Sequence, residues 1–327
     1  MTIAQILGGF PKLSALVVGD ICLDRWCTYD PTTSEPSRET QIPRIGVVRT
    51  EVTAGAGGTV ANNLAALGVG RLGVLSVAGD DGSGYELAAA LKAIGVASDM
   101  LIRAPGMQTF TYTKLINLNT GVEDRPRFDF ISNTTLKPDI EQQVLDRLPY
   151  AVAQFDVILI SDQAETSAGG VVTSAVRESL ANLAVTHPQK IFLIDSRARI
   201  ELFRNMTLKP NRDEAESACR RIFGRVDLQG LREFCKSRLM IVTDGPNGAR
   251  LIAPGEETLY ETKPISKPVD ICGAGDSFSA GAALALAVTG SPAEAVRFGN
   301  LVASVTIMKK GTGTASPAEV LAAAARL

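Results

Sequence analysis

Short apolar segments alternate with amphipathic helical patterns along most of this 327-residue chain, and this alternation restricts its fold more than any other feature. Apolar segments that predict strands occupy residues 15–18, 72–77, 157–160, 191–194 and 239–242. Helical patterns between them cover residues 60–67, 85–94, 171–185 and 214–223. Strands that alternate with helices are typical of a parallel sheet with helices on both faces. The sequence therefore predicts a three-layer α/β/α domain with a mostly parallel central sheet.

Helix boundaries are marked by glycine and by capping sequences. The patterns over 60–67 and 85–94 stop at Gly68 and Gly95, and glycine is the commonest residue just beyond a helix. Two Ser-Pro-Ala-Glu sequences, beginning at Ser291 and Ser316, each combine a capping box with proline at the first helical position. They predict two helix starts near the end of the sequence.

One region interrupts the alternation of strands and helices. Residues 28–55 are rich in Pro, Thr, Ser and Arg and then show partial strand alternation without a helix, and residues 108–117 and 127–130 are similar. We expect a single domain over residues 1–327, with a small β lid drawn from about 28–55 and 108–130. A β-hairpin excursion without function is the alternative. An exposed apolar face on such a lid would favour a homodimer.

Composition excludes several classes of protein. The formal net charge is −2, which gives no reason to expect a nucleic-acid partner. No apolar run approaches the ~18 residues of a membrane helix, and the first residues lack the pattern of a secretory leader, so we expect a cytoplasmic protein without a membrane partner. The five cysteines form no CxxC pair and are expected to be buried free thiols.

The sequence contains one histidine, His187, which lies beside a proline between a helical pattern and a strand. A turn residue is expected at that position. Serine–histidine triads and histidine-rich metal sites are therefore poor hypotheses. Carboxylates must carry out any acid–base chemistry.

The strongest chemical signal is the segment DICGAGDSF, residues 270–278, which leads directly into a helical pattern. The small residues Gly273, Ala274 and Gly275 let a ligand approach the backbone, and amide groups at a helix start favour an anion. Asp276 would lie beside that anion, where a carboxylate can accept the proton of an attacking hydroxyl. The alternative for Asp276 is a helix cap on a glycine turn.

Two further segments follow predicted strands. Asn211 and Glu214 fit a capping box, and they equally fit a pair that holds magnesium-bound water beside phosphates. Thr243, Gly245 and Gly248 fit a tight hairpin or a contact to nucleotide phosphates. Both interpretations stay open for each segment.

A glycine-rich segment at 55–68 precedes a helical pattern whose first turns carry Thr59, Asn62 and Asn63. Hydroxyl and amide groups there suit a polyhydroxylated ligand. The third glycine of a GxGxxG fingerprint would fall at Val60, and GxxxxGK[ST] occurs nowhere in the sequence. The dinucleotide fingerprint and the Walker loop are therefore both missing.

Taken in order, these segments make the chain resemble the ribokinase, or PfkB, family of carbohydrate kinases from about Ala15 onward. The matching motifs are Gly19-Asp20 with Asp24, residues 55–68, GDDG at 79–82, NRDE at 211–214 and GAGD at 273–276. Within the family, the sequences GDICLDRW, RFDF, ISD and LKPN and residues 308–314 most resemble the kinase of D-glycero-β-D-manno-heptose 7-phosphate.

The resemblance implies an ATP-dependent transfer to a sugar or sugar-phosphate hydroxyl. It implies that Asp276 is the catalytic base and that the amides of residues 273–275 form the anion hole. Asn211 and Glu214 would serve Mg²⁺ and the phosphates. The nucleotide would lie near Thr243, Gly245, Gly248 and Asn300, the last beside adenine.

On the acceptor side, the resemblance implies that Asp24 binds sugar hydroxyls. The glycine-rich segment offers Gly55, Gly57, Thr59 and Asn63 as further substrate-binding candidates. The resemblance also implies a K⁺ site formed by Asp270 with backbone carbonyls near Cys272 and in residues 308–314. Independently, five cations lie in the segments outside the strand–helix alternation and could clamp an acceptor phosphate: Arg38, Arg44, Lys114, Arg125 and Arg127. Solvated lid charges are the alternative.

Two positions depart from the family pattern. The family usually has asparagine where this chain has Thr59, and Asn62 or Asn63 could replace its contact. After Asp162 the heptose kinases resemble YAKG, whereas this chain reads QAETSAGG. The second departure lies beside the expected acceptor site and bears on the choice of substrate.

Two alternatives to a kinase are considered. A dinucleotide-dependent oxidoreductase fits the alternation of strands and helices but lacks its glycine fingerprint. A catalytically idle sugar- or nucleotide-binding regulator fits the fold and the threonine at position 59. The intact GAGD and NxxE motifs favour the kinase.

Overall fold

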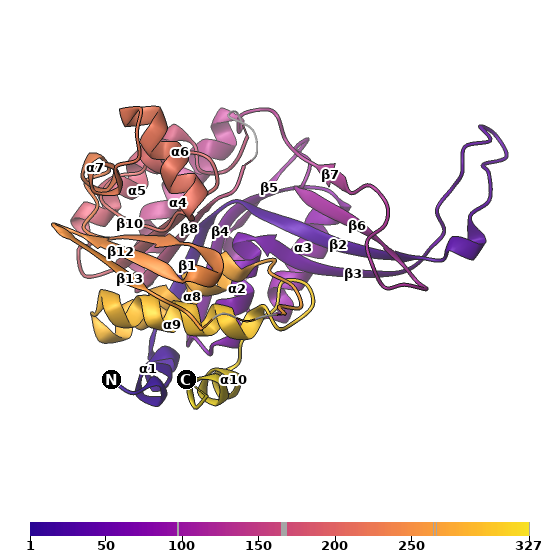
Figure 1. Ribbon diagram of the computed structural model, residues 1–327. Helices are drawn as coiled ribbons and strands as arrows, with labels where there is room; N and C mark the ends of the chain where they lie inside the picture. The colour runs from indigo at the N-terminus through magenta and orange to yellow at the C-terminus, as the bar shows by residue number, and fades with distance from the viewer. Residues whose placement is uncertain (97, 165–168, 264, 266, 327) are drawn as a thin grey trace.

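The computed structural model describes residues 1–96, 98–164, 169–263, 265 and 267–326 (Figure 1). Within these residues the main sheet has nine strands. In spatial order they are β13 (Glu256–Tyr260), β12 (Ala249–Ala253), β11 (Met240–Thr243), β10 (Thr207–Leu208), β9 (Ile191–Ser196), β8 (Val157–Asp162), β1 (Ser14–Gly19), β4 (Arg71–Gly79) and β5 (Leu101–Ala104). The strands from β11 to β5 pair in parallel, and β12 and β13 complete the sheet as an antiparallel hairpin.

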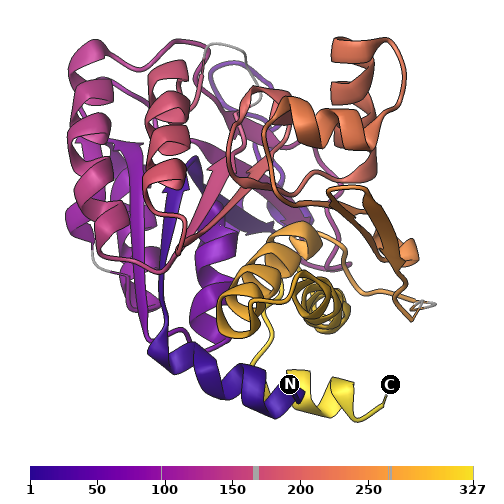
Figure 2. The ribbon, with the colours of Figure 1, turned by 90° about the vertical axis from the view of Figure 1, so that its left-hand side faces the viewer.

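Helices cover both faces of this sheet (Figure 2). Because successive side chains of a strand point to opposite faces, Leu16 and Val18 of β1 join one core cluster and Ala15 and Val17 join another. The first cluster includes α4 (Pro138–Ala153), α5 (Ser174–Thr186), α6 (Arg212–Phe223) and α7 (Leu228–Phe234). The second includes α1 (Ile3–Gly9), α2 (Gly57–Ala66), α3 (Gly82–Ala93), α8 (Ala274–Thr289), α9 (Pro292–Thr306) and α10 (Pro317–Ala324). The predicted three-layer fold is confirmed.

All five predicted strands are present, each within three residues of its expected limits. The helix predicted over 171–185 is wrong at its start, because α5 begins at Ser174. Thr173 caps it by accepting a hydrogen bond from the Val176 N–H at 3.2 Å, and the Val171 N–H instead donates to the Asp20 carboxylate at 2.6 Å. A side-chain acceptor far away in the sequence therefore displaces the helix start.

A separate four-stranded sheet forms the lid, in the order β3 (Val47–Ala56), β2 (Ile21–Tyr29), β6 (Thr111–Asn117) and β7 (Phe128–Phe130). The prediction placed lid strands from about residue 28, whereas β2 starts at Ile21, directly after β1. Gly19 has φ of 120°, and this left-handed conformation redirects the chain from the main sheet into the lid. Residues 30–46 form an arm that extends far from the rest of the molecule (Figure 1).

Short 3₁₀ helices occur at Phe10–Lys12, Pro31–Thr33, Ser98–Met100, Ile200–Leu202 and Gly245–Asn247. Both predicted serine caps are found. Ser316 forms a complete capping box, whereas Ser291 only accepts from the Glu294 N–H at 3.4 Å, because the Glu294 carboxylate pairs with Arg297 at 3.0 Å. His187 is the C-cap of α5, as expected of a turn residue.

All five cysteines are free, and four of them are buried, as predicted. Cys272 is the exception, because it is exposed. Across the described part of the chain, no helix has the length and apolar character needed to cross a membrane.

Candidate active site

The segment 273–276 separates two cavities. Gly273 and Asp276 line one of them, and Ala274 and Gly275 line the other. Gly273 precedes α8 with φ of 77°, a conformation that glycine adopts without strain. Asp276 lies in the first turn of α8, and its carboxylate accepts no hydrogen bond from the residues that the structure describes. Its carboxylate is therefore not engaged as a helix cap, and Asp276 lines one of the two cavities.

The first turn of a helix offers N–H groups that have no partner within the helix. In α8 the Ala274 N–H donates to the Ile271 carbonyl at 3.2 Å, which leaves the amides that follow it for a ligand. The helix dipole adds partial positive charge at this end. Among the predicted anion-hole residues 273–275, Ala274 therefore has its N–H occupied within the chain, whereas the Gly275 N–H makes no hydrogen bond to the described residues.

The cavity on the Gly275 side has a volume of ≈ 400 Å³. The turn between β11 and β12 supplies Thr243, Gly245 and Gly248, and α9 supplies Asn300. The other walls are largely apolar and include Pro246, Pro268, Ile271, Phe278, Ala303 and Ile307. The structure thus brings Thr243, Gly245, Gly248 and Asn300, which were predicted to lie near the nucleotide, into the same cavity as Ala274 and Gly275.

Asn300 lies deep on this side and is held in a fixed orientation. Its Nδ2 donates to the Tyr260 carbonyl at 3.0 Å. Its Oδ1 is consequently the group left to face a ligand, and an apolar slot with one amide oxygen suits a flat base that carries an N–H donor.

The second cavity has a volume of ≈ 230 Å³ and lies between the lid and the main sheet. The lid strands supply Cys22, Asp24, Trp26, Tyr112 and Lys114, and Arg127 precedes β7. Gln163, Arg197, Gly273, Asp276 and Thr312 come from the main domain, and Ala56 and Thr59 from the junction of β3 with α2. The lid therefore forms one complete wall of this cavity.

Charges of both signs line the second cavity. Lys114 lies 3.6 Å from Glu123, and Arg127 pairs with Asp129 at 2.6 Å while its guanidinium lies 5.1 Å from the Tyr112 ring centre. Burial raises the pKa of Asp24 above its usual range. Lys114, Arg127 and Arg197 are cations on the wall of this cavity, and charge-assisted hydrogen bonds from such groups suit a polar anionic molecule.

Three predicted phosphate-clamp residues do not line this cavity. Arg38 and Arg44 lie on the arm, where Arg44 pairs with Glu35 at 3.2 Å. The guanidinium of Arg125 lies 5.8 Å from the Tyr29 ring centre. Lys114 and Arg127 are the two members of the predicted set that the fold brings to the cavity.

The glycines of the 55–68 segment make room for other groups. A Cβ at Gly55 would lie 2.4 Å from Asp24 Oδ2, and a Cβ at Gly57 would lie 2.8 Å from the Asp20 carbonyl oxygen. Neither glycine is among the residues that line the cavity. Their role in this structure is to admit the backbone and the Asp24 carboxylate.

The second cavity contains the predicted sugar-binding residue Asp24 and is therefore called the acceptor-side cavity. Thr59 lines this cavity, but Asn62 and Asn63 do not. Asn62 donates to the Ala54 carbonyl at 3.0 Å. Asn63 is fully buried and donates to the Thr59 carbonyl at 2.9 Å. The structure therefore gives no support for either asparagine in place of the family's contact at position 59.

A buried ammonium lies behind the anion hole. Lys209 is 3% exposed, its Nζ lies 2.7 Å from Asp195 Oδ2, and a Cβ at Gly275 would be 3.4 Å from it. Burial, reinforced by Asp195, raises the pKa of Asp276 to about 7, and Lys209 opposes this rise. Asp276 therefore titrates near neutrality, which suits a general base.

Glu214 belongs to the same group of charges. Burial and the Asp195 carboxylate raise its pKa to about 6. Its Oε2 accepts from the Asn211 N–H at 2.7 Å and Asn211 Oδ1 accepts from the Glu214 N–H at 2.9 Å, so the capping-box interpretation is confirmed. Glu214 Oε1 accepts no hydrogen bond from the described residues, so the metal interpretation is compatible with the cap.

No group of three or more His, Cys, Asp or Glu side chains that could hold a metal occurs among the described residues. A divalent ion near Glu214 would thus keep most of its ligands as water and phosphate oxygens, which is the usual coordination of Mg²⁺. Asp270 accepts from the Cys272 N–H at 2.9 Å and from the Gly311 N–H at 3.1 Å, and so ties the two predicted K⁺-site loops together.

Sequence reasoning missed Asp195, Arg197 and Lys209. Asp195 and Arg197 lie at the carboxyl end of β9, the edge of a parallel sheet at which ligands bind. That position was available from the predicted strand at 191–194. The altered sequence after Asp162 includes residues 165–168, which lie outside the described residues.

Comparison with known proteins gives one family and several relatives. A profile described as pfkB family carbohydrate kinase matches residues 13–319. The bifunctional protein HldE of Trichlorobacter lovleyi is 32% identical over 317 residues, or 95% of this chain. The chain spans 62% of the length of that relative.

Solved structures with the same fold include three bacterial proteins. Ribokinase from Thermotoga maritima has a TM-score of 0.71 and 22% identity, over 96% of this chain and 99% of its own. Phosphofructokinase-2 from Escherichia coli in complex with potassium has a TM-score of 0.69 and 19% identity, over 96% of this chain and 99% of its own. A putative ribokinase II from E. coli in complex with ATP and Mg²⁺ has a TM-score of 0.68 and 17% identity, over 96% of this chain and 100% of its own. At these identities the similarity establishes the fold.

Proposed function

Because the chain belongs to the pfkB family of ATP-dependent carbohydrate kinases, which phosphorylate a sugar hydroxyl, we propose that its acceptor is a sugar that already carries a phosphate. D-glycero-β-D-manno-heptose 7-phosphate is the first candidate. The main support for a phosphorylated acceptor is that Lys114, Arg127 and Arg197 all line the acceptor-side cavity. Arginine and lysine bind phosphate through charge-assisted hydrogen bonds.

The choice of a heptose has two supports. The motifs of the sequence resemble the heptose 7-phosphate kinases, and the curated relative with 32% identity is a bifunctional protein HldE. Asp24 also lines the cavity and offers a carboxylate for sugar hydroxyls.

In the proposed reaction, Asp276 accepts the proton of the acceptor hydroxyl while the oxygen of that hydroxyl attacks the γ-phosphorus of ATP. The bond from that phosphorus to the β–γ bridging oxygen breaks, and ADP leaves. Gly275 and the α8 terminus stabilise the charge on the transferred group. Lys209, next to Gly275, adds a fixed positive charge at the same place.

Asn211 and Glu214 would hold Mg²⁺ through water, and the ion would neutralise charge on the ATP phosphates. The three carboxylates Asp195, Glu214 and Asp276 face Lys209 and Arg197, so this region accommodates one more cation. K⁺ is a further proposed cofactor, near Asp270.

Two copies of the chain are proposed to associate through the lid. The lid carries exposed apolar side chains on β3 (Val47, Val48, Val52) and β7 (Phe128, Phe130). Burial of these side chains in a homodimer would remove an exposed sheet edge.

An ADP-release assay with ATP and Mg²⁺ tests the proposal. The panel contains heptose 7-phosphate, fructose 6-phosphate and ribose 5-phosphate, each beside its unphosphorylated parent. We expect a higher kcat/KM for a sugar phosphate than for its parent. Preference for the parent would remove the acceptor phosphate from the proposal and leave a neutral-sugar kinase, and absence of turnover with the whole panel would favour an idle binding protein.

A further inference from the structure

Asp20 lies where the chain passes from the main sheet into the lid. Its backbone N–H donates to the Ser161 carbonyl at 2.7 Å, at the end of β8. Its own carbonyl accepts from the Gly57 N–H at 2.9 Å, at the start of α2. Asp20 is thus fixed to both parts of the molecule that enclose the acceptor-side cavity.

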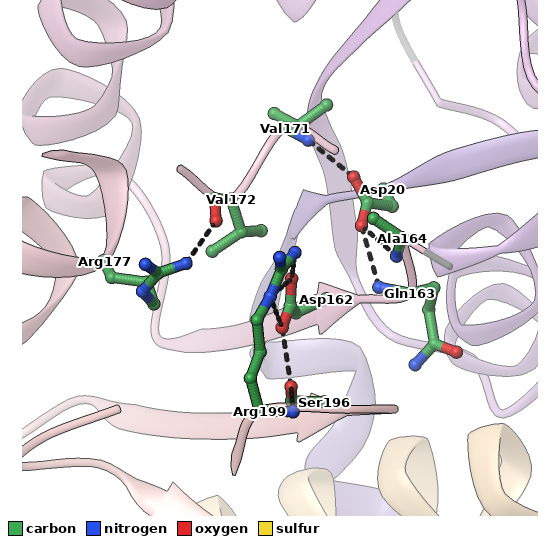
Figure 3. A network of polar contacts seen from close by, with 9 residues as sticks. All are labelled: Asp20, Asp162, Gln163, Ala164, Val171, Val172, Arg177, Ser196 and Arg199. Carbon is green, nitrogen blue, oxygen red and sulfur yellow. Dashed lines mark hydrogen bonds and ion pairs between the residues drawn. The ribbon is translucent and has the colours of Figure 1, made fainter. Parts of the chain in front are cut away.

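The carboxylate of Asp20 is 2% exposed and accepts three backbone N–H groups (Figure 3). Oδ2 accepts from Gln163 at 2.8 Å and from Ala164 at 2.9 Å, and Oδ1 accepts from Val171 at 2.6 Å. Glycine is favoured beside it, since Gly170 has φ of 102° and a Cβ there would lie 2.7 Å from Ala164 Cβ. The Asp20 side chain therefore anchors the backbone of Gln163 from the segment that joins β1 to β2.

The residue before Gln163 is fixed as well. Asp162 is buried, receives a hydrogen bond from Ser196 Oγ at 2.6 Å and pairs with Arg199 Nη2 at 2.6 Å (Figure 3). Gln163 is consequently held between two anchored positions. Its side chain extends away from the Asp20 carboxylate in the same view.

The Gln163 side chain lines the acceptor-side cavity. Its carboxamide makes no hydrogen bond to the residues that the structure describes. The cavity is also lined by cations, carboxylates and the hydroxyl-bearing residues Thr59, Tyr112 and Thr312. A carboxamide is neutral and offers two N–H donors and an acceptor oxygen at the end of a longer side chain. This pair of capacities matches a sugar hydroxyl, which also does both.

We propose that Gln163 binds a hydroxyl group of the acceptor sugar and selects for it, and that Asp20 is the positioning residue that holds Gln163 in place. This inference rests on the proposed function and specifies one contact of its acceptor. An anchored backbone restricts where the carboxamide can reach, so one hydroxyl position of the sugar should be read and the others not.

The first test compares Gln163→Ala with the unaltered chain, using heptose 7-phosphate and its monodeoxy analogues, with fructose 6-phosphate as the second probe. Loss of one hydrogen bond should lower acceptor kcat/KM about tenfold, mainly through KM, with the KM for ATP and the Tm unchanged. In the unaltered chain each deoxy analogue should have a lower kcat/KM than the complete sugar. For one analogue this difference should disappear in Gln163→Ala, because the missing hydroxyl and the missing carboxamide belong to the same hydrogen bond. Gln142→Ala, on α4 far from the cavity, is the matched control.

The second test uses Asp20→Asn, which keeps the shape but replaces one acceptor oxygen by a donor. Hydrogen exchange at the amides of Gln163, Ala164 and Val171 should accelerate at least tenfold, and acceptor kcat/KM should fall as in Gln163→Ala. The double variant should lose little more than either single one. Asp227→Asn, a helix cap on α7, should leave all three amides unchanged.

The outcomes separate the inference from the proposed function. If the protein turns over an acceptor, but every deoxy analogue loses as much kcat/KM in Gln163→Ala as in the unaltered chain, the inference about Gln163 is overturned and the proposed function stands. Unchanged exchange at the three amides in Asp20→Asn overturns the positioning role even if Asp20→Asn loses stability. Absence of turnover with every sugar and sugar phosphate removes the proposed function, and this inference with it.

Discussion

The buried ammonium of Lys209 lies 2.7 Å from Asp195 Oδ2, and a Cβ at Gly275, in the predicted anion hole, would lie 3.4 Å from the same nitrogen. Glu214 and Asp276 both experience this pair, since Asp195 raises their pKa and Lys209 lowers it. The pair therefore sets how readily the proposed base loses its proton, although neither residue needs to touch the acceptor. It also makes the assignment of Asp276 testable by two opposite changes.

Replacing Asp276 with Asn should abolish most turnover while leaving ATP binding intact. Asn has the same shape but cannot accept the proton, and a general base contributes ~10²–10⁴ in rate. We expect kcat to fall at least ~100-fold, measured by ADP release, with the Kd for ATP from calorimetry within about threefold of normal. Near-normal kcat would demote Asp276 to a structural residue of the helix start.

The pH profile of kcat/KM should rise through about pH 7, because Asp276 with a pKa of about 7 must be ionised to act. Asp195→Asn removes a charge that raises this pKa and should move the rising limb to lower pH. Lys209→Met removes the charge that lowers it and should move the limb to higher pH. The measurement is kcat/KM from pH 5.5 to 9 for the three proteins.

Equal shifts in the same direction for Asp195→Asn and Lys209→Met would contradict this account, because a general loosening of the site cannot discriminate between the two signs of charge. Asp213→Asn, which removes a carboxylate from the first turn of α6, controls for a change in net charge.

Stability should decrease as pH rises from 5 to 8. Burial raises the folded-state pKa of Asp20 to about 6, of Glu214 to about 6 and of Asp276 to about 7, so the folded chain binds protons more tightly than the unfolded chain in this range. The unfavourable ionisation develops as pH passes through these values. Urea denaturation at each pH should show it, and Asp276→Asn should flatten the slope; a slope that steepens or stays unchanged in Asp276→Asn would contradict the raised pKa.

The sequence predicted the main sheet well because strand and helix periodicity is local. It failed at β2, because the lid strand begins at Ile21, directly after the Gly19-Asp20 pair that ends the apolar run of β1. The change of direction there depends on φ at Gly19, on the Asp20 N–H, which donates to the Ser161 carbonyl, and on the Asp20 carbonyl, which accepts from the Gly57 N–H. Such contacts join distant segments, so composition around residue 20 does not reveal them.

The candidate site shows the same limit. Asn63 follows Thr59 by four residues and so lies on the same helix face, one turn deeper, where it is fully buried. Chemistry at a helix start predicted a ligand contact for both residues, and both are buried, but only Thr59 lines the cavity, whereas the Asn63 carboxamide donates to the Thr59 carbonyl. Lys209 was quoted as part of a motif, yet its pairing with Asp195 requires two adjacent strands of the sheet.

Monovalent cations should activate the enzyme. Asp270 holds the anion-hole loop to the loop at residue 311 through two amide hydrogen bonds, and a cation beside these carbonyl-rich loops would stiffen the glycine turn. We expect higher kcat in KCl than in tetramethylammonium chloride at equal ionic strength, and Asp270→Asn should lose this difference. Equal rates in the two salts would remove the K⁺ site from the proposal.

Arg127→Ala should weaken the acceptor and leave ATP unaffected. Arg127 lines the acceptor-side cavity, whereas Arg125, two residues earlier, lies by Tyr29 away from it, so Arg125→Ala is a control of equal charge in the same segment. Two charge-assisted bonds of ~1.5–3 kcal/mol each correspond to a loss of roughly 100-fold or more in acceptor kcat/KM. Arg127 also pairs with Asp129, which would lose this partner in Arg127→Ala, so Asp129→Asn measures how much of the loss comes from that ion pair.

The loss in kcat/KM should occur with the sugar phosphate and be absent with its unphosphorylated parent, since the parent has no phosphate for Arg127 to bind. An equal loss with both compounds would show that Arg127 shapes the lid rather than binds the phosphate, and the proposal of a phosphorylated acceptor would then rest on Lys114 and Arg197 alone.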